Sequence, residues 1–284
     1  MVKEAVVNEQ VLLAGCGDLG MRVAQRLRAR GDEVWALRRE PPLPDDSGIR
    51  WLRGDLTRPE TLRELPVGIT RVVYLPTPDR RDPAAYRSTF VDGLRHLHGA
   101  LDHAHLQRML LVSSSAVYGE HAGGWVDEGT PPAPPGFNGS VLLEAEQWLA
   151  TQPVPSIVLR LAGLYGPGRL QLIERLRAGQ LKVPRAHAHW ANRIHADDAA
   201  AAIVHLLQLA DPLPLYVGVD STPLLLDVLY DHLSALIGAP LAEDGPAPVG
   251  IGSKRLSNAR LRASGFMPRW PDSRDGYTAL LNRG

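Results

Sequence analysis

Three glycines spaced as Gly-x-Gly-x-x-Gly stand near the start of the chain, in Gly15-Cys16-Gly17-Asp18-Leu19-Gly20. The apolar run Val11–Ala14 leads into them and predicts a strand, and apolar residues at helical spacing follow them. At a strand-to-helix turn this spacing is typical of a dinucleotide-binding loop. The first Gly allows a tight turn, the second lets the backbone approach a pyrophosphate, and the third lets the helix pack on the strand. A glycine-rich turn that binds no nucleotide is the alternative.

Two arginines end the second predicted strand, near Val34–Leu37. A site selective for NAD usually has Asp or Glu at this point, about 20 residues beyond the glycines, to hold the ribose 2′-hydroxyl. Arg38 and Arg39 instead offer guanidinium groups that can hold a 2′-phosphate through two hydrogen bonds. The sequence therefore favours NADP(H) as cofactor, with NAD(H) possible and a solvated arginine pair as the alternative.

Two later strand ends complete the predicted cofactor site. Asp55, followed by Leu56, comes after the third strand, where its carboxylate could accept a hydrogen bond from the adenine amino group. Gly54-Asp55 is also an ordinary turn signal. The rigid segment Leu75-Pro76-Thr77 follows the fourth strand and could lie along the cofactor's ribose.

Strand-like and helix-like segments alternate, which predicts an α/β fold with a Rossmann-type, doubly wound parallel sheet of about seven strands. We expect strands near 11–14, 34–37, 49–52, 72–75, 109–112, 157–159 and 216–219. We expect helices after Asp18 and at about 83–103, 139–151, 169–179, 197–210, 223–237 and 257–264. Residues 8–165 with about 190–220 are predicted to form the NAD(P)-binding domain. Residues 166–189 with 221–284 are predicted to form a small substrate-binding lobe.

Composition restricts the classes of partner. The chain has 284 residues, 31 basic and 31 acidic, so no general attraction to nucleic acid or to a membrane surface is expected. No apolar run approaches the roughly 18 residues that span a bilayer, and the N-terminal stretch is not typical of a signal peptide. The single cysteine, Cys16, excludes an internal disulfide. We predict a soluble cytoplasmic protein that acts on a small-molecule substrate.

Several further motifs together resemble the extended branch of the short-chain dehydrogenase/reductase superfamily, and its NAD-dependent epimerase/dehydratase family most of all. Ser113–Gly119 is similar to the family's S-S-x-x-V-Y-G, and Arg160–Arg169 to its R-x-x-x-x-Y-G-P-G-R. Arg193–Asp198 looks like its I-H-V-D-D helix start, and Tyr216–Asp220 like its last core strand. The resemblance covers nearly the whole chain in the right order.

The resemblance implies a catalytic Ser or Thr and a Tyr and Lys in Y-x-x-x-K, of which this chain matches only the first. Ser114 stands at the Ser/Thr position. Y-x-x-x-K occurs nowhere, and aligning the family's helix places Asn138 at the Tyr position and Leu142 at the Lys position. Asn cannot exchange a proton near neutral pH, so an acid–base contribution of about 10²–10⁴ in rate is missing unless another group supplies it.

The groups that could replace the missing tyrosine are Tyr118 and Tyr165, at the carboxyl ends of predicted strands, and His195. A purely structural role is the alternative for each. We therefore expect an NADP(H)-dependent oxidoreductase of an atypical kind acting on a small carbonyl or alcohol, with Ser114 orienting the substrate oxygen. A catalytically idle NADP(H)-binding sensor and a nucleotide-sugar epimerase or dehydratase are the alternatives.

Four histidines between residues 96 and 105 lack the spacing and the acidic or thiol partners of a zinc site, so no metal is predicted. The resemblance suggests that the helix expected at 83–103 forms the seam of a homodimer.

Overall fold

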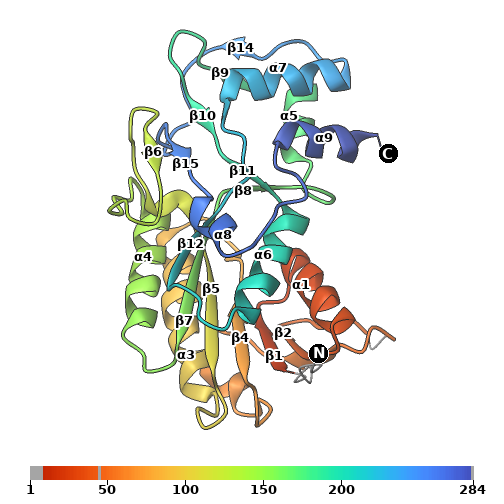
Figure 1. Ribbon diagram of the computed structural model, residues 1–284, viewed down its shortest axis with the longest axis vertical. Helices are drawn as coiled ribbons and strands as arrows, with labels where there is room; N and C mark the ends of the chain where they lie inside the picture. The colour runs from red at the N-terminus through yellow and green to blue at the C-terminus, as the bar shows by residue number, and fades with distance from the viewer. Residues whose placement is uncertain (1–8, 44–45, 283–284) are drawn as a thin grey trace. The chain divides into compact units, whose positions relative to one another are not determined.

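The computed structural model describes residues 9–43 and 46–282 (Figure 1). A seven-stranded parallel sheet has the strand order β12-β7-β5-β4-β1-β2-β3. Its strands are β1 (Gln10–Ala14), β2 (Glu33–Arg38), β3 (Arg50–Arg53), β4 (Arg71–Tyr74), β5 (Arg108–Ser114), β7 (Ser156–Leu161) and β12 (Leu215–Gly218). This Rossmann-type order confirms the predicted fold class and all the predicted strands.

The helices are α1 (Asp18–Ala29), α2 (Pro83–Arg87), α3 (Gly93–Ala100), α4 (Phe137–Ala150), α5 (Gln171–Arg177), α6 (Ala196–Gln208), α7 (Leu226–Ile237), α8 (Ala259–Ala263) and α9 (Ser273–Leu281). From β1 the chain crosses to its neighbour β2 toward one edge of the sheet, and from β4 it crosses to β5 toward the other edge. Right-handed crossovers therefore place α1 and α3 on opposite faces of the sheet. In the part of the chain that the structure describes, no helix combines the length and apolar character that crossing a membrane requires.

The continuous helix predicted at 83–103 is wrong. The segment divides into α2, the π-helical turn η2 (Ser88–Asp92) and α3, which ends at Ala100. The Tyr74 hydroxyl, 15 residues before Thr89, donates to the Thr89 carbonyl at 2.5 Å. That carbonyl lies inside η2, and Gly93 lets the same hydroxyl approach closely, since a Cβ there would be 2.7 Å from it. A buried phenol inserted into the helix thus accounts for the wide turn.

Packing divides the chain into two compact units. The first, here called the nucleotide unit, comprises the residues up to Ser113 with Glu144–Val158 and Ile203–Pro214. The second, here called the C-terminal unit, comprises Ser114–Leu143, Leu159–Ala202 and the residues from Leu215 on. The domain boundaries expected from the sequence stay a prediction, and residue 8, where the first was placed, lies outside the described residues.

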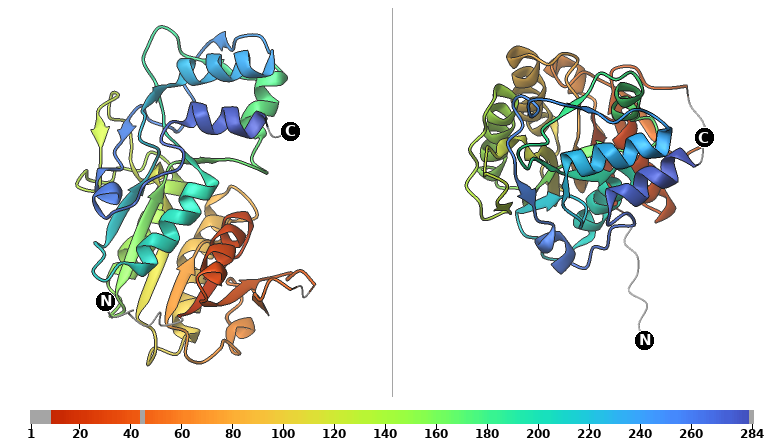
Figure 2. Two further views of the ribbon diagram at one scale, coloured as in Figure 1. Left: turned by 45° about the vertical axis from the view of Figure 1, so that its right-hand side comes forward. Right: turned by 90° about the horizontal axis from the view of Figure 1, so that it is seen from above.

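The C-terminal unit is built from paired short strands and small helices (Figure 2). Besides β12 and the end of β7, its strands are β6 (Trp125–Val126), β8 (Gly163–Tyr165), β9 (Lys182–Val183), β10 (Trp190–Ala191), β11 (Arg193–His195), β13 (Leu224–Leu225), β14 (Glu243–Asp244) and β15 (Arg255–Leu256). Buried residues of α5, α7 and α9 form a separate apolar core that includes Ile173, Leu229 and Tyr277. Segments this short have no periodicity of their own, so the sequence did not predict these strands or α9.

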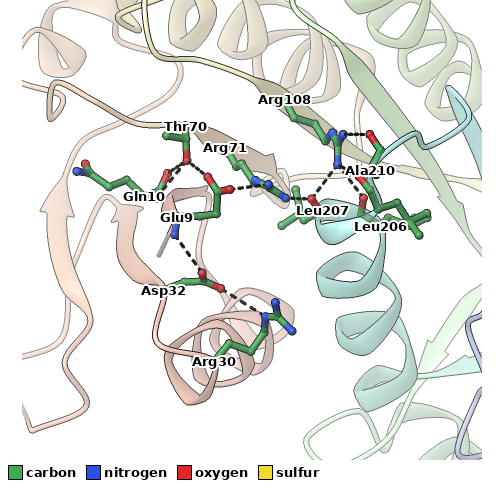
Figure 3. Close-up of polar contacts among 11 residues, drawn as sticks. Glu9, Gln10, Arg30, Asp32, Thr70, Arg71, Arg108, Leu206, Leu207 and Ala210 are labelled. Carbon is green, nitrogen blue, oxygen red and sulfur yellow. Dashed lines mark hydrogen bonds and ion pairs between the residues drawn. The ribbon is translucent and has the colours of Figure 1, made fainter. Parts of the chain in front are cut away.

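Charged side chains fix the amino-terminal edge of the sheet in the nucleotide unit (Figure 3). Arg71 on β4 pairs with Glu9 at 2.6 Å and donates to the Leu207 carbonyl. Arg108 on β5 donates to the carbonyls of Leu207 at 2.8 Å and Leu209 at 2.6 Å. Two guanidinium groups therefore satisfy the carbonyls at the end of α6 and complement its negative dipole end.

Candidate functional site

A hollow of about 770 Å³ opens in the nucleotide unit at the carboxyl ends of β1, β2, β3 and β4. This is the edge at which open parallel sheets bind ligands. The loop after each strand contributes to it, and so do α2 and η2. The lining residues are Gly15, Cys16, Gly17, Leu37, Arg38, Arg39, Glu40, Gly54, Asp55, Leu56, Thr57, Pro76, Thr77, Asp79, Arg80, Ala85, Ser88 and Thr89.

The three glycines differ in what surrounds them. Gly15 has a φ of +88°, and a Cβ there would stand 2.5 Å from the Cα of Pro76. Gly17 precedes α1 without a side-chain cap, and nothing lies within 4 Å of where its Cβ would be. Gly20 faces the Cys16 Sγ, which would stand 2.9 Å from a Cβ at this position. The turn therefore has open space at the second glycine, above the free N–H groups of a helix N-terminus, where a pyrophosphate fits.

The other predicted cofactor residues divide into those at the surface of the hollow and those behind it. Arg38, Arg39, Asp55, Leu56, Pro76 and Thr77 line the hollow. Asp18 pairs with Arg22 at 3.2 Å on α1, whereas Leu19 and Leu75 are buried. Their contacts with a cofactor stay predictions.

The two arginines have different surroundings. No hydrogen bond or ion pair engages the Arg38 guanidinium within the residues the structure describes, and this side chain is exposed. Arg39 instead donates twice to Asp79, once at 2.6 Å. That hydrogen bond is the main reason why the pKa of Arg39 is raised and the pKa of Asp79 is lowered. Of the two arginines, Arg38 is thus the one whose guanidinium no side chain of the described residues engages.

Asp55 is held by its own turn. Its Oδ1 accepts from the Thr57 amide at 2.9 Å and from the Thr57 hydroxyl at 2.8 Å. One carboxylate oxygen is therefore already engaged, which leaves Oδ2 for the predicted contact with adenine. Arg58 Nε lies 4.0 Å from this second oxygen.

The thiol of Cys16 is buried in the turn. It lies 3.9 Å from the Met21 sulfur, and burial raises its pKa to about 12. Because the thiolate is the nucleophile, this raised pKa disfavours reaction of Cys16 at neutral pH.

Ser114 and Asn138, which the resemblance places at the reaction site, lie in the C-terminal unit. The Ser114 Oγ accepts from the Ala116 amide at 3.2 Å and caps the short turn η3 (Ser115–Val117). Gly139 brings the first turn of α4 against that segment, since a Cβ there would overlap the Ala116 carbonyl oxygen. Asn138 is half-buried and Leu142, one turn further, is buried. No acid or base thus replaces the missing pair at either position.

Tyr118 is enclosed by a polar network. Its hydroxyl donates to the Asp127 carbonyl at 2.8 Å and accepts from Arg160 Nη1 at 2.8 Å, and the ring is 1% exposed. The Arg160 guanidinium also lies over the ring, 4.8 Å from its centroid. These contacts are typical of a structural tyrosine, and a part in proton transfer stays a prediction.

Tyr165 is buried as well, in an aromatic cluster. It stacks on Tyr277 with ring centroids 4.2 Å apart and meets the edge of His195 at 5.1 Å. Its hydroxyl has no hydrogen-bond partner among the described residues, and burial raises its pKa. His195 is buried and accepts from the Asp197 amide at 3.1 Å. A raised pKa makes Tyr165 a weaker acid than a free phenol, so its predicted catalytic role stays untested.

Sequence reasoning missed Asp79, Arg80, Ser88 and Thr89 in the hollow. The charged run after β4, Asp79–Asp82, was the available signal. The two hydroxyl residues reach the hollow because η2 interrupts the helix, which no local pattern announces.

Comparison with known proteins decides the family. The model of the NAD-dependent epimerase/dehydratase family matches residues 11–216. The chain belongs to this family. Membership confirms the resemblance seen in the motifs and makes the chain a member of a group of NAD(P)-dependent enzymes.

Three relatives of this family member cover most of its length. Protein YeeZ of Escherichia coli (strain K12) is 31% identical over 252 residues, 81% of this chain and 84% of its own. A Streptomyces protein named 3-diazoavenalumate denitrifying reductase is 28% identical over 300 residues, 94% of this chain and 98% of its own. A solved structure from Methylobacillus flagellatus, assigned to the NAD-dependent epimerases/dehydratases, is 39% identical, with a TM-score of 0.82 and coverage of 98% and 99%.

Proposed function

We propose that this protein is an NADP(H)-dependent reductase of the epimerase/dehydratase family that acts on a small organic electrophile, such as a carbonyl compound. The proposal of NADP(H) as cofactor is supported by the Arg38 guanidinium, which lines the hollow without a partner among the described residues. A 2′-phosphate would supply two to three acceptor oxygens for it, whereas a 2′-hydroxyl would leave it unused.

The residues of the hollow fit the rest of the nucleotide. Gly17 and the N-terminus of α1 suit the pyrophosphate, and Ser88 and Thr89 are further lining residues with hydroxyl side chains. Bound NADPH supplies a hydride; the protein's part is to bind, orient and exclude water. Ser114 would orient the substrate oxygen through its hydroxyl.

Cofactor fluorescence on titration with NADPH and NADH tests the binding step. Arg38→Asp is expected to lower the affinity for NADPH by at least about tenfold, since one charge-assisted contact of about 1.4 kcal/mol or more is lost. The affinity for NADH should stay within about twofold of wild type. Arg177→Asp, on the exposed surface of α5, controls for the change of charge. An unchanged ratio of the two affinities in Arg38→Asp contradicts the assignment.

A second candidate substrate class is one that accepts a hydride and loses a leaving group, with no proton needed. Two points together favour it. The motif alignment puts Asn138 and Leu142 at the positions of the family's proton-transfer pair, and a relative over 94% of the chain is named a denitrifying reductase of a diazo compound. With a diazonium group, the hydride forms the new C–H bond while the C–N bond breaks and its electron pair leaves in N₂. NADPH becomes NADP⁺, and no proton enters.

Stopped-flow oxidation of bound NADPH separates these possibilities. The rate of NADPH oxidation is to be compared between aldehydes or ketones and aryl diazonium salts. Enzyme-free mixtures and the Arg38→Asp variant serve as controls. Carbonyl turnover supports the main proposal, diazonium turnover alone supports the second, and oxidation by neither class supports the nucleotide-binding sensor.

A further inference from the structure

The ion pair of Arg39 and Asp79 joins two loops across the glycine-rich turn. In the sheet β1 lies between β4 and β2, and its end carries Gly15 and Gly17. Arg39 follows β2 and Asp79 follows β4, and both side chains line the same hollow as the two glycines. The pair therefore connects the two strands that flank the glycine turn.

The pair uses the geometry that a phosphate would use. Both terminal nitrogens of Arg39 donate to the two carboxylate oxygens of Asp79, with Nη2 at 2.6 Å from Oδ1. A planar guanidinium presents the same two-pronged face to a carboxylate and to a phosphate, so it cannot offer that face to both at once. Asp79 thus occupies the position that a phosphate on Arg39 would take.

Charge in the hollow adds to this competition. The carboxylates of Asp79, Asp55 and Glu40 all act on Arg39 and raise its pKa, Asp79 most strongly. The side chain of Asp79 is 63% exposed and that of Arg39 is 55% exposed, so the pair can open at little cost. Arg38, in the preceding position, has no such partner among the described residues.

We propose that Asp79 is a specificity-determining residue that competes with the 2′-phosphate of NADP(H) for Arg39. This rests on the proposed function, because it assumes that the hollow binds the nucleotide. NADP(H) breaks the pair and takes Arg39 in addition to Arg38. NAD(H), which has a hydroxyl at that position, leaves the pair intact. Asp79 therefore lowers the preference for NADP(H) below what two free arginines would give.

Affinities of the full-length protein for NADPH and NADH, measured by fluorescence, test this. Asp79→Asn removes the charge at nearly constant size. It is expected to raise the affinity for NADPH about two- to fivefold, the range for an exposed ion pair, and to leave the affinity for NADH unchanged. Asp79→Glu keeps the carboxylate and should stay near wild type. Asp211→Asn, the same substitution at an exposed position that does not line the hollow, removes one negative charge and should change neither affinity.

A double-mutant cycle with Arg39→Met identifies the partner. In that background Asp79→Asn should no longer tighten NADPH, because no guanidinium is released. The inference is overturned if Asp79→Asn lowers the affinity for NADPH or leaves it unchanged. It is also overturned if the substitution changes the affinities for NADPH and NADH equally, as expected if the ion pair only holds the two loops together. A wild-type protein that binds neither nucleotide refutes the proposed function itself; NADPH binding with a preference independent of Asp79 overturns only this inference.

Discussion

Arg160 and Tyr118, 42 residues apart, form a buried hydrogen bond of 2.8 Å from Nη1 to the phenol oxygen. Both belong to motifs by which the chain resembles its family, and their contact joins the end of β7 to the segment after β5. A family signature here marks packing as much as chemistry.

Tyr118→Phe is expected to reduce stability more than hydride transfer. The substitution removes the phenol's donor and acceptor and takes this acceptor away from the buried Arg160 guanidinium, at a cost of about 1–3 kcal/mol. If Tyr118 does not move a proton, the rate at which bound NADPH is oxidised should fall by less than about tenfold, against the 10²–10⁴ that loss of a general acid costs. Chemical denaturation and single-turnover kinetics measure the two effects separately, and a loss of rate at unchanged stability would support the predicted catalytic role.

Arg108→Leu is expected to destabilise the nucleotide unit. The guanidinium donates to several carbonyls at the end of α6, and these acceptors would lose a charged partner at a partly buried site. We expect a loss of about 1–3 kcal/mol in the free energy of unfolding, measured by urea denaturation. Arg177→Leu, at an exposed position of α5, is the control and should cost less than about 0.5 kcal/mol. Equal effects of the two substitutions would show that the capping contacts contribute nothing.

The sequence predicted the sheet well because buried parallel strands appear as short apolar runs, such as Val72 to Tyr74, that need no partner to be visible. It failed at the helix of 83–103 because the cause of the interruption, the Tyr74 hydroxyl, comes from another element. The same holds for the site. Gly15 to Gly20 and Arg38 carry a local pattern, whereas the pairing of Arg39 with Asp79 joins residues 40 apart. Local pattern predicts where a ligand binds; the contacts that compete with it are tertiary.

Asp220 should make stability fall as the pH rises. Burial raises its pKa to about 8, and its Oδ2 has no hydrogen-bond partner among the described residues. The folded protein therefore keeps a proton that the unfolded chain, with a carboxyl pKa of about 3.9, releases. The contribution of the protonated Asp220 to the free energy of unfolding is fully present below about pH 4. It is lost progressively up to about pH 8, at no more than about 1.4 kcal/mol per pH unit.

Asp220→Asn mimics the protonated acid and removes this dependence. The urea midpoint of the variant should rise relative to that of the wild type from pH 5 to pH 7 and again from pH 7 to pH 9. Because the other titrating groups are common to both proteins, the difference isolates Asp220. A difference that stays constant with pH would show that Asp220 is ionised in the folded state.

Cys16 should resist alkylation with or without nucleotide. Burial and a pKa of about 12 leave little thiolate at pH 7.5, so iodoacetamide should label the folded protein about 10²–10³-fold more slowly than the protein in urea. Mass spectrometry of timed samples gives both rates. Rapid labelling of the folded protein that NADPH prevents would mean that the turn opens when the nucleotide is absent.

Gly17→Ala and Gly15→Ala separate binding from folding. At Gly17 a Cβ meets nothing within 4 Å and φ is −90°, so the protein should lose no more than about 1 kcal/mol, the cost of a poorer N-cap. The new methyl group would nevertheless occupy the space proposed for the pyrophosphate, and NADPH affinity should fall at least about tenfold. At Gly15 the φ of +88° and the 2.5 Å approach of Pro76 make the same substitution strained, so stability itself should fall by about 1–3 kcal/mol. Thermal melts and NADPH titrations of the two variants test the contrast, and undiminished NADPH binding by a folded Gly17→Ala would remove the glycine turn from the nucleotide site.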